Sequence, residues 1–283
     1  MACENHRGCG GYRNSMPSYR QPNGPQRIVC LTEEPTEILY SLGQGDRVVG
    51  ISAYTVRPPE AKREKPVVSA FVGGSVSKIA ALRPDLVIGF SDIQADLARD
   101  LIAANLPVLI FNQRSIQEIL DVIVDLGSLV HCRKAAQQMV AQYVSHLEAV
   151  HERAEARADR PRVYFEEWDD PMICGIRWVS ELIEIAGGKD IFSERAQGKL
   201  AKERFVDEKE VLAADPEIML ASWCGKPLDA ASVRARKTMG SISALQTRRL
   251  FEVPPEIILQ PGPACLTDGL DRLEQIISGE VDP

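Results

Sequence analysis

The segment ALRPDLVIG, at residues 81–89, contains the end of a helix, a proline, an acidic residue and a buried strand, in that order. A second segment, AADPEIMLA at residues 213–221, repeats this order. Helix–proline–strand junctions can recur by chance. The shared order nevertheless favours an internal repeat, and it predicts two similar α/β lobes.

Short β-branched runs alternate with amphipathic helical segments from Arg27 onward, which is typical of a parallel sheet covered by helices. The first half contains four strand-like runs, RIVCL, RVVGIS, DLVIGF and PVLIF, and ends in the helical segment SIQEILDVIVDLG. After Pro161 the alternation restarts with VYFEEW. Between the halves, apolar residues at spacings of three and four over 134–157 predict one helix of ~36 Å, long enough to lie across two lobes.

We therefore predict an α/β fold of two Rossmann-like lobes with parallel sheets, joined by one long linking α-helix. The predicted boundaries are a disordered tail at 1–25, an N-terminal lobe at 26–130, the linking helix at 131–159 and a C-terminal lobe at 160–283. Cys3, His6 and Cys9 could together hold a metal, but the surrounding Gly, Asn, Pro and Ser residues favour the disordered tail.

The composition is that of a globular protein, with 45% hydrophobic and 26% charged residues in 283. A net charge of −7 and the absence of a Lys/Arg-rich run argue against nucleic acid or an anionic membrane as the main partner. The small basic cluster of Arg234, Arg236 and Lys237 is expected to form a solvated face. Seven cysteines without CxxC spacing suggest a reducing compartment. No apolar run has the length of a secretory signal or a membrane span, so we expect a cytoplasmic monomer without membrane insertion.

Ligands of open parallel α/β sheets bind outside the carboxyl ends of the strands. Two of the three tryptophans fall at such ends, beside carboxylates and amides, which suits a large planar or amphipathic ligand. Packing in the core remains the alternative for each tryptophan and for the cysteine. The strand ends give these candidates: Glu33, Glu34, Tyr54, Phe90, Asp92, Gln113, Trp168, Asp169, Trp223 and Cys224.

The stretch EEWDDPMICG, at 166–175, could be read as a catalytic acid cluster. Glu166 and Glu167 alternate across a strand, so we expect one of them to face away from the ligand and be solvated. Asp169 and Asp170 are adjacent and do not suit the separation of a paired acid and base. Residues 171–175 are expected to turn the chain into the next helix.

Catalytic motifs are missing from the sequence: it contains no GxSxG, no HExxH and no Walker loop, and VGGSVSK at 72–78 lacks the spacing of one. We predict binding without catalysis, with no catalytic residue and no resident metal.

The ordered segments RIVCLTEEPTEILYSLG, RVVGISAYTVRPP, VGGSVSKIAALRPDLVIGF, PVLIFNQRSIQEIL and AGGKDIF resemble the class III periplasmic-type substrate-binding proteins of ABC importers. Within that group the similarity is greatest to cobalamin-binding proteins. The resemblance implies two lobes that hinge little about a rigid helix and hold cobalamin, haem or an iron siderophore between them. It implies ligand contacts for Tyr54 and Phe90, and adds Phe71, where the family commonly has tryptophan.

The resemblance also implies docking on an ABC permease through one acidic residue on each lobe. Ser77 occupies the first of these positions, so the first docking acid is absent. The second falls near Lys209, which Asp207, Glu208 and Glu210 flank. Family members carry a secretory signal or a lipoprotein cysteine, so a periplasmic location is expected only if the true start lies upstream.

The ligand predicted first is a corrinoid, because its amide arms and apolar face suit aromatic and carboxylate side chains. Ferric siderophores are usually anionic and need arginines, whereas the strand ends are acidic and amide-bearing. Haem could bind through Tyr54, although Glu33, Glu34 and Asp169 would repel its propionates. A metal-dependent, chelatase-like enzyme that uses the same cleft is the remaining alternative.

Overall fold

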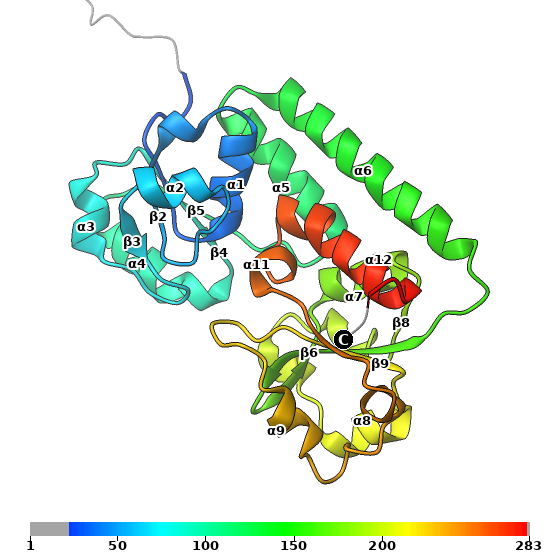
Figure 1. The fold of residues 1–283 in the computed structure, drawn as a ribbon. Coiled ribbons are helices and arrows are strands. Elements are labelled where there is room, and N and C mark those ends of the chain that lie inside the picture. The colour runs from blue at the N-terminus through cyan, green and yellow to red at the C-terminus, as the bar shows by residue number, and fades with distance from the viewer. Residues whose placement is uncertain (1–22, 282–283) are drawn as a thin grey trace, which may run out of the picture.

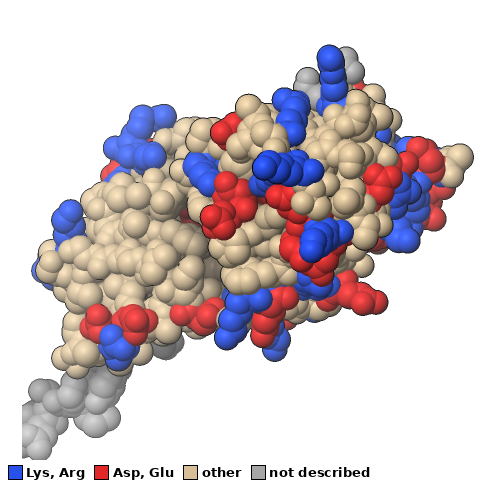
Figure 2. Space-filling view, turned by 90° about the horizontal axis from the view of Figure 1, so that it is seen from below, with Lys and Arg blue, Asp and Glu red and all other residues tan. Residues whose placement is uncertain are grey.

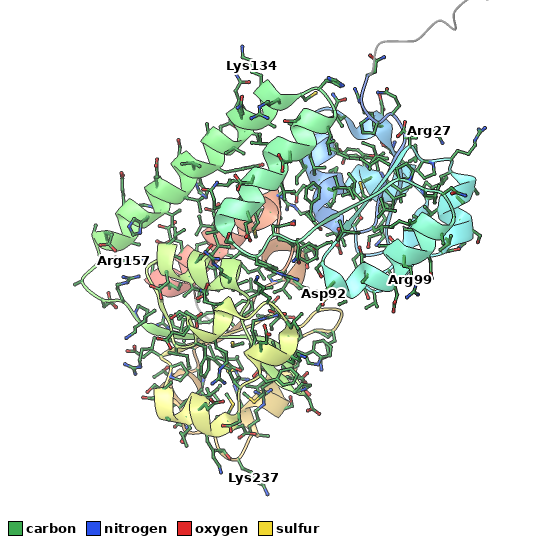
Figure 3. All side chains as sticks on the ribbon, turned by 180° about the vertical axis from the view of Figure 1, so that it is seen from behind. Arg27, Asp92, Arg99, Lys134, Arg157 and Lys237 are labelled. Carbon is green, nitrogen blue, oxygen red and sulfur yellow. The ribbon has the colours of Figure 1, made fainter. Side chains whose placement is uncertain are left out.

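The computed structural model describes residues 23–281, so the possible metal group of Cys3, His6 and Cys9 lies outside the described residues, as does most of the expected tail. Two α/β lobes are connected by one long helix, α6 (Arg133–Glu155), which confirms the predicted architecture (Figure 1). Its 23 residues correspond to ~35 Å. Lys134 and Arg157 mark the two ends of this helical segment in Figure 3.

The N-terminal lobe contains a five-stranded parallel sheet in the order β3-β2-β1-β4-β5. The four predicted strands are present, and the fifth is a short run that the sequence analysis did not identify, β3. The strands are β1 (Ile28–Cys30), β2 (Val48–Ser52), β3 (Val67–Ser69), β4 (Leu86–Phe90) and β5 (Val108–Phe111). The helices of this lobe are α1 (Glu33–Ser41), α2 (Pro59–Glu64), α3 (Val76–Ala81) and α4 (Ala95–Ala103).

The C-terminal lobe contains a sheet in the order β10-β9-β6-β7, with β8 also paired to β6. One strand, β7, is antiparallel to β6, so the expectation that 171–175 only turns the chain into a helix was wrong. The strands are β6 (Arg162–Asp169), β7 (Met172–Cys174), β8 (Lys189–Asp190), β9 (Ile218–Ala221) and β10 (Leu250–Glu252). The helices are α7 (Arg177–Ile185), α8 (Glu208–Ala214), α9 (Ala230–Arg234) and α10 (Ser243–Gln246).

A layer of helices joins the two lobes. It consists of α5 (Ile116–Leu129), α6, α7, α11 (Pro255–Ile258) and α12 (Leu270–Ser278), with α6 packed on α5, α7 and α12. Ser115 and Glu118 form a capping box that begins α5 directly after β5. One apolar core continues from the N-terminal sheet through these helices into the C-terminal sheet.

The chain after β10, which the predicted boundaries assign to the C-terminal lobe, returns to the middle of the molecule and contacts the N-terminal lobe. Gln113 donates a hydrogen bond to the carbonyl of Pro261 (3.2 Å), and Arg57 forms an ion pair with Asp268 (2.7 Å). The backbone N–H of Ala264 donates to Glu37 Oε2 on α1 (3.3 Å). These contacts bind the C-terminal segment to the N-terminal lobe.

A buried ion pair holds the C-terminal lobe together at the carboxyl end of β6. Glu166 is fully buried, and both of its oxygens accept from Arg236, at 2.5 and 2.9 Å. Tyr164 Oη and Trp223 Nε1 also donate to Glu166. The expected alternation of Glu166 and Glu167 is present, but the inward residue is paired and not solvated. Arg236 was likewise wrongly assigned to a solvated face, because no local sequence pattern indicates its partner 70 residues away.

In Figure 2, charges of both signs are interspersed over one half of the face shown, the half beside the grey residues is mostly uncharged, and no large patch of a single sign is visible.

Replacing Arg236 tests the buried pair. We expect Arg236→Met to lower the free energy of unfolding by ~3 kcal/mol, because Glu166 would remain buried without its cation. The exposed Arg234, two residues earlier, is the matched control, and Arg234→Met should change stability by less than ~0.5 kcal/mol. Denaturant titration measures both values, and equal effects of the two substitutions would contradict the assignment.

Candidate functional site

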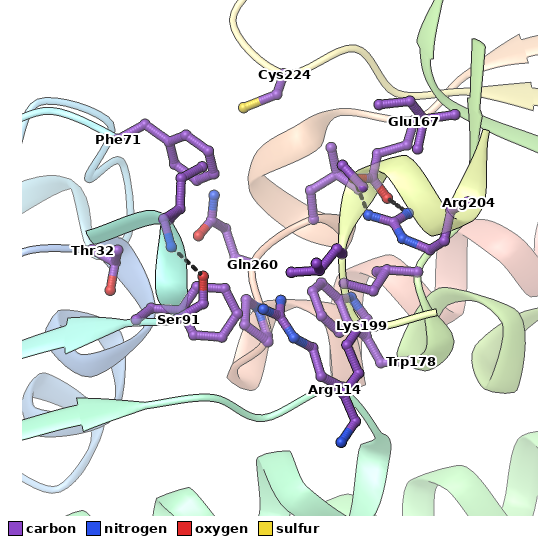
Figure 4. A pocket seen from close by; sticks show the side chains of 18 of the residues that line it. Thr32, Phe71, Ser91, Arg114, Glu167, Trp178, Lys199, Arg204, Cys224 and Gln260 are labelled. Carbon is purple, nitrogen blue, oxygen red and sulfur yellow. Dashed lines mark hydrogen bonds and ion pairs between the residues drawn. The ribbon is translucent and has the colours of Figure 1, made fainter. Parts of the chain in front are cut away.

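A cavity of about 310 Å³ opens between the two lobes (Figure 4). Its walls are built from the carboxyl ends of β1, β4 and β5 on one side and from β6, β7 and the turn Ala201–Arg204 on the other. The segment 259–261 closes the third side. Asp92 lies at this boundary between the lobes in Figure 3. The cavity therefore lies where the sequence analysis expected a cleft, outside the carboxyl ends of strands from both lobes.

Six of the eleven candidate residues line this cavity: Glu34, Phe71, Phe90, Asp92, Trp168 and Cys224. Their contact with a ligand remains a prediction. Phe71 and Phe90 come from the N-terminal lobe and Trp168 from the C-terminal lobe, so apolar ring surface faces the cavity from both sides. Cys224 follows β9, and burial, together with Glu33 and Glu167, raises the pKa of its thiol.

The other five candidates lie off the cavity wall. Tyr54 packs edge-on against Phe71, with ring centroids 6.5 Å apart, and its hydroxyl lies beside Gly225 of the opposite lobe. Gln113 is buried against the segment 259–261. Glu33 is buried and close enough to Cys224 to affect that thiol. The structure therefore places these three behind or beside the wall.

Trp223 and Asp169 take part in a cluster next to the cavity. Trp223 is only 3% exposed and belongs to the core of the C-terminal lobe. Lys226 Nζ lies 4.4 Å from the centroid of the Trp168 ring and 4.8 Å from that of Trp223, and it pairs with Asp169 at 2.6 Å. This cation contacts both indoles and an acid at once. It restrains Trp168, whose Nε1 also donates to the carbonyl of Asp170.

Two adjacent glutamates at the start of α1 are protonated more readily than ordinary carboxyls. Burial raises the pKa of Glu33 to about 7. Burial, reinforced by the charge of Glu33, raises the pKa of Glu34 to about 8. One oxygen of Glu34 accepts from Thr32 Oγ1 at 2.9 Å, and the other has no hydrogen-bond partner. At neutral pH, Glu34 therefore contributes little negative charge to the cavity.

Three cations in the cavity were not among the candidates: Arg114, Lys199 and Arg204. Arg204 is buried and pairs with both oxygens of Glu167, at 2.5 and 2.9 Å, and it also donates to the carbonyl of Cys174. Arg114 enters from the end of β5, and its guanidinium lies 4.9 Å from the centroid of the Phe90 ring. Figure 4 shows both arginines reaching into the cavity from different elements.

The sequence contains enough information to predict one of these three cations. Arg114 directly follows the strand-end residue Gln113, so a strand-end list extended by one residue would have included it. Arg204 and Lys199 lie in or near a short turn, where the sequence shows neither a strand pattern nor a helical period. Trp178, on α7, also lines the cavity and was not a candidate, because it does not directly follow a strand. Sequence reasoning also treated the cleft as acidic and poor in arginine, and this expectation was wrong.

Comparison with known proteins identifies the family. The sequence pattern described as "Periplasmic binding protein" matches residues 28–257. The chain belongs to the periplasmic binding protein family. Family members are substrate-binding proteins that bind small ligands and work with ABC transporter permeases, which confirms the resemblance seen in the sequence.

Two relatives and one solved structure illustrate the range of this family. An uncharacterized ABC transporter substrate-binding lipoprotein of Bacillus subtilis is 27% identical over 262 residues, which are 89% of this chain and 80% of that protein. The vitamin B12-binding protein of Vibrio campbellii is 30% identical over 204 residues, 71% of this chain and 72% of its own length. A periplasmic heme binding protein from Pseudomonas aeruginosa has the same fold, with a TM-score of 0.78 at 19% identity, over 92% of this chain and 95% of that one.

The lipoprotein relative gives no support to the expected cytoplasmic location. Within 23–281, no helix has both the length and the apolar character needed to cross a membrane. Among the same residues, no three His, Cys, Asp or Glu side chains are grouped closely enough to hold a metal ion.

The predicted docking positions lie on α3 and α8. Ser77 is in the first turn of α3, and its hydroxyl lies 3.1 Å from that of Ser75. Near Lys209 all three flanking acids are already engaged. Asp207 caps α8, Glu208 accepts from the backbone of Thr238 and Met239, and Glu210 pairs with Arg195.

The raised pKa of Glu34 has a consequence for stability. Its ordinary pKa is 4.5 and its folded value is about 8, so the folded chain binds this proton more tightly than the unfolded chain. The resulting stabilisation is fully present below pH 4.5 and is lost as the pH rises to about 8.

In the Glu34→Gln variant the side chain is neutral at every pH, so the free energy of unfolding should not show this pH-dependent decrease. Relative to the variant, the wild-type free energy of unfolding should fall by roughly 4 kcal/mol between pH 5 and 8.5. Denaturant titrations across this range provide the measurement, with Glu256→Gln, an exposed residue of α11, as the control. If Glu34→Gln follows the wild-type pH profile, Glu34 is ionised in the folded chain and the assignment is wrong.

Proposed function

We propose that this chain is a non-catalytic binding protein for a tetrapyrrole, with a corrinoid as the first candidate. The observation that carries the proposal is the cavity between the lobes, whose walls present Phe71, Phe90, Trp168 and Trp178 together with a few polar groups. Flat apolar rings suit the face of a corrin or porphyrin, and the polar groups fix its orientation. The vitamin B12-binding relative at 30% identity supports the corrinoid.

The cavity is smaller than a complete corrinoid would need, so the ligand must extend beyond its mouth. Exposed apolar side chains directly next to wall residues provide surface for this. Val72 follows Phe71 and is 58% exposed, Phe205 follows Arg204 and is 42% exposed, and Tyr54, also 42% exposed, packs on Phe71. We propose that these three residues contact the outer part of the ligand.

Haem is the second candidate, and two observations favour it. The repulsion of propionates expected from Glu33, Glu34 and Asp169 is weakened, because the pKa values of the glutamates are raised and Asp169 is paired with Lys226. Tyr54 also presents an exposed phenol at the mouth, which is a known type of haem-iron ligand.

We further propose that the chain presents its ligand to an ABC permease outside the cytoplasm, as the lipoprotein relative supports. Because the acids near Lys209 are engaged within the lobe and Ser77 carries no charge, this docking would use other groups.

Titration with cyanocobalamin and with haem tests the proposed function. We expect at least one of them to bind with a dissociation constant below ~100 μM, which corresponds to about 5.5 kcal/mol. Quenching of tryptophan fluorescence gives the readout, since Trp168 and Trp178 line the cavity. Failure of both ligands to bind at this level would exclude the proposal.

Replacing Trp168 tests whether the cavity is the binding site. Trp168→Ala should weaken binding of the preferred ligand by ~1 to 3 kcal/mol without unfolding the chain, because its ring forms part of the wall. Trp168→Phe keeps an aromatic face and should lose less affinity. Calorimetric titration measures the affinity and circular dichroism the folding; an unchanged affinity in both variants would place the ligand elsewhere.

A further inference from the structure

Arg114 carries donors that the protein does not use. Its side chain is only 15% exposed, and its Nε is buried without a hydrogen-bond partner. The ion pair recorded for it, between Nη2 and Asp92 Oδ1, is long, at 3.5 Å, and Asp92 is 63% exposed. The guanidinium instead lies over the ring of Phe90 and points into the cavity (Figure 4).

The acids around Arg114 are engaged elsewhere. Glu118 accepts from the backbone N–H groups of residues 114 and 115 in the capping box of α5. Glu167 is taken by Arg204. Glu181 accepts from the backbone of Ile116 and pairs with Arg177. Among the described residues, the exposed Asp92, at 3.5 Å, is therefore the carboxylate that pairs with Arg114, and it leaves most of the guanidinium donors unused.

The surroundings of Arg114 disfavour its positive charge. Burial lowers the pKa of Arg114, and the nearby cation Arg204 lowers it further, while Asp92 offsets part of this effect. An incompletely paired buried cation costs free energy. An anionic group that entered the cavity would remove this cost and could accept two parallel hydrogen bonds from the planar guanidinium.

We infer that Arg114 is the receptor for a carboxylate on the ligand, so that the site prefers an acid-bearing tetrapyrrole over its fully amidated or esterified form. This inference rests on the proposed tetrapyrrole binding and adds to it the class of ligand. Lys199, exposed at the edge of the cavity, extends the positive charge toward solvent. The protonated state of Glu34 removes the acid that would otherwise oppose such a ligand.

Matched ligand pairs test the inference. The first pair is haem and haem dimethyl ester, which differ only in the two carboxylates. The second is cyanocobalamin and its monocarboxylic acids, in which one propionamide is hydrolysed, with each isomer measured separately. In the wild type we expect the acid form, or at least one acid isomer, to bind at least 10-fold more tightly than its neutral partner.

Arg114→Gln should reduce this preference to less than 2-fold, and Arg114→Lys, which keeps the charge but not the planar fork, should retain part of it. Arg99→Gln on α4, whose side chain is 68% exposed, is the control and should behave as the wild type. Thermal unfolding of each variant checks that Arg114 does not act through folding alone.

The outcomes separate the two proposals. If no member of either pair binds to the wild type, tetrapyrrole binding itself is excluded. If the ligands bind but acid and neutral forms do so equally, or if Arg114→Gln keeps the full preference, the tetrapyrrole proposal stands and the carboxylate receptor is overturned.

Discussion

One continuous apolar cluster runs from the first strand of the N-terminal lobe through α5, α6, α7 and α12 into the C-terminal sheet, beside smaller clusters within each lobe. In a protein with two separate cores, the lobes can rotate about a linker at little cost. Here such a rotation would expose packed residues of the helical layer, such as Leu147, Val150 and Leu273. The hydrogen bonds and ion pair from 261–268 to α1 and neighbouring loops add polar contacts across the same boundary. We therefore propose that this core limits rotation of the lobes and keeps the width of the cavity nearly constant.

The wall of the cavity contains polar groups that are buried and incompletely paired, an arrangement that costs free energy. Glu34 is buried with one unpaired oxygen, and Arg114 is a poorly paired cation at the same wall. Other charges near the cavity are neutralised within a single lobe, as in the pairs Glu167–Arg204 and Asp169–Lys226. Paired charges position side chains, whereas unpaired groups are available to a ligand. We propose that the division between the two kinds determines which ligands the cavity prefers.

The sequence predicted the fold well, because strand-end turns and helix periods are local signals. The long helix, the restart after Pro161 and the meeting of strand ends from both lobes all follow from such patterns. The errors arose where partners are distant in sequence. Trp223 and Cys224 are neighbours at one strand end, yet only Cys224 reaches the cavity, while Trp223 donates to a glutamate 57 residues away. Arg204 and Trp178 became wall residues through tertiary packing, which no period in the sequence encodes. The antiparallel β7 was missed because Pro171 and its polar neighbours also suit a simple turn.

A crystal structure of the chain with its bound tetrapyrrole would test the central claim most directly, namely that a rigid shared core keeps a ready-made cavity between the lobes. The account predicts that the ring lies between Phe90 and Trp168, with the two lobes placed as they are in the free chain. A ligand bound on another surface, or a large rotation of one lobe relative to the other with the helical layer repacked, would contradict it.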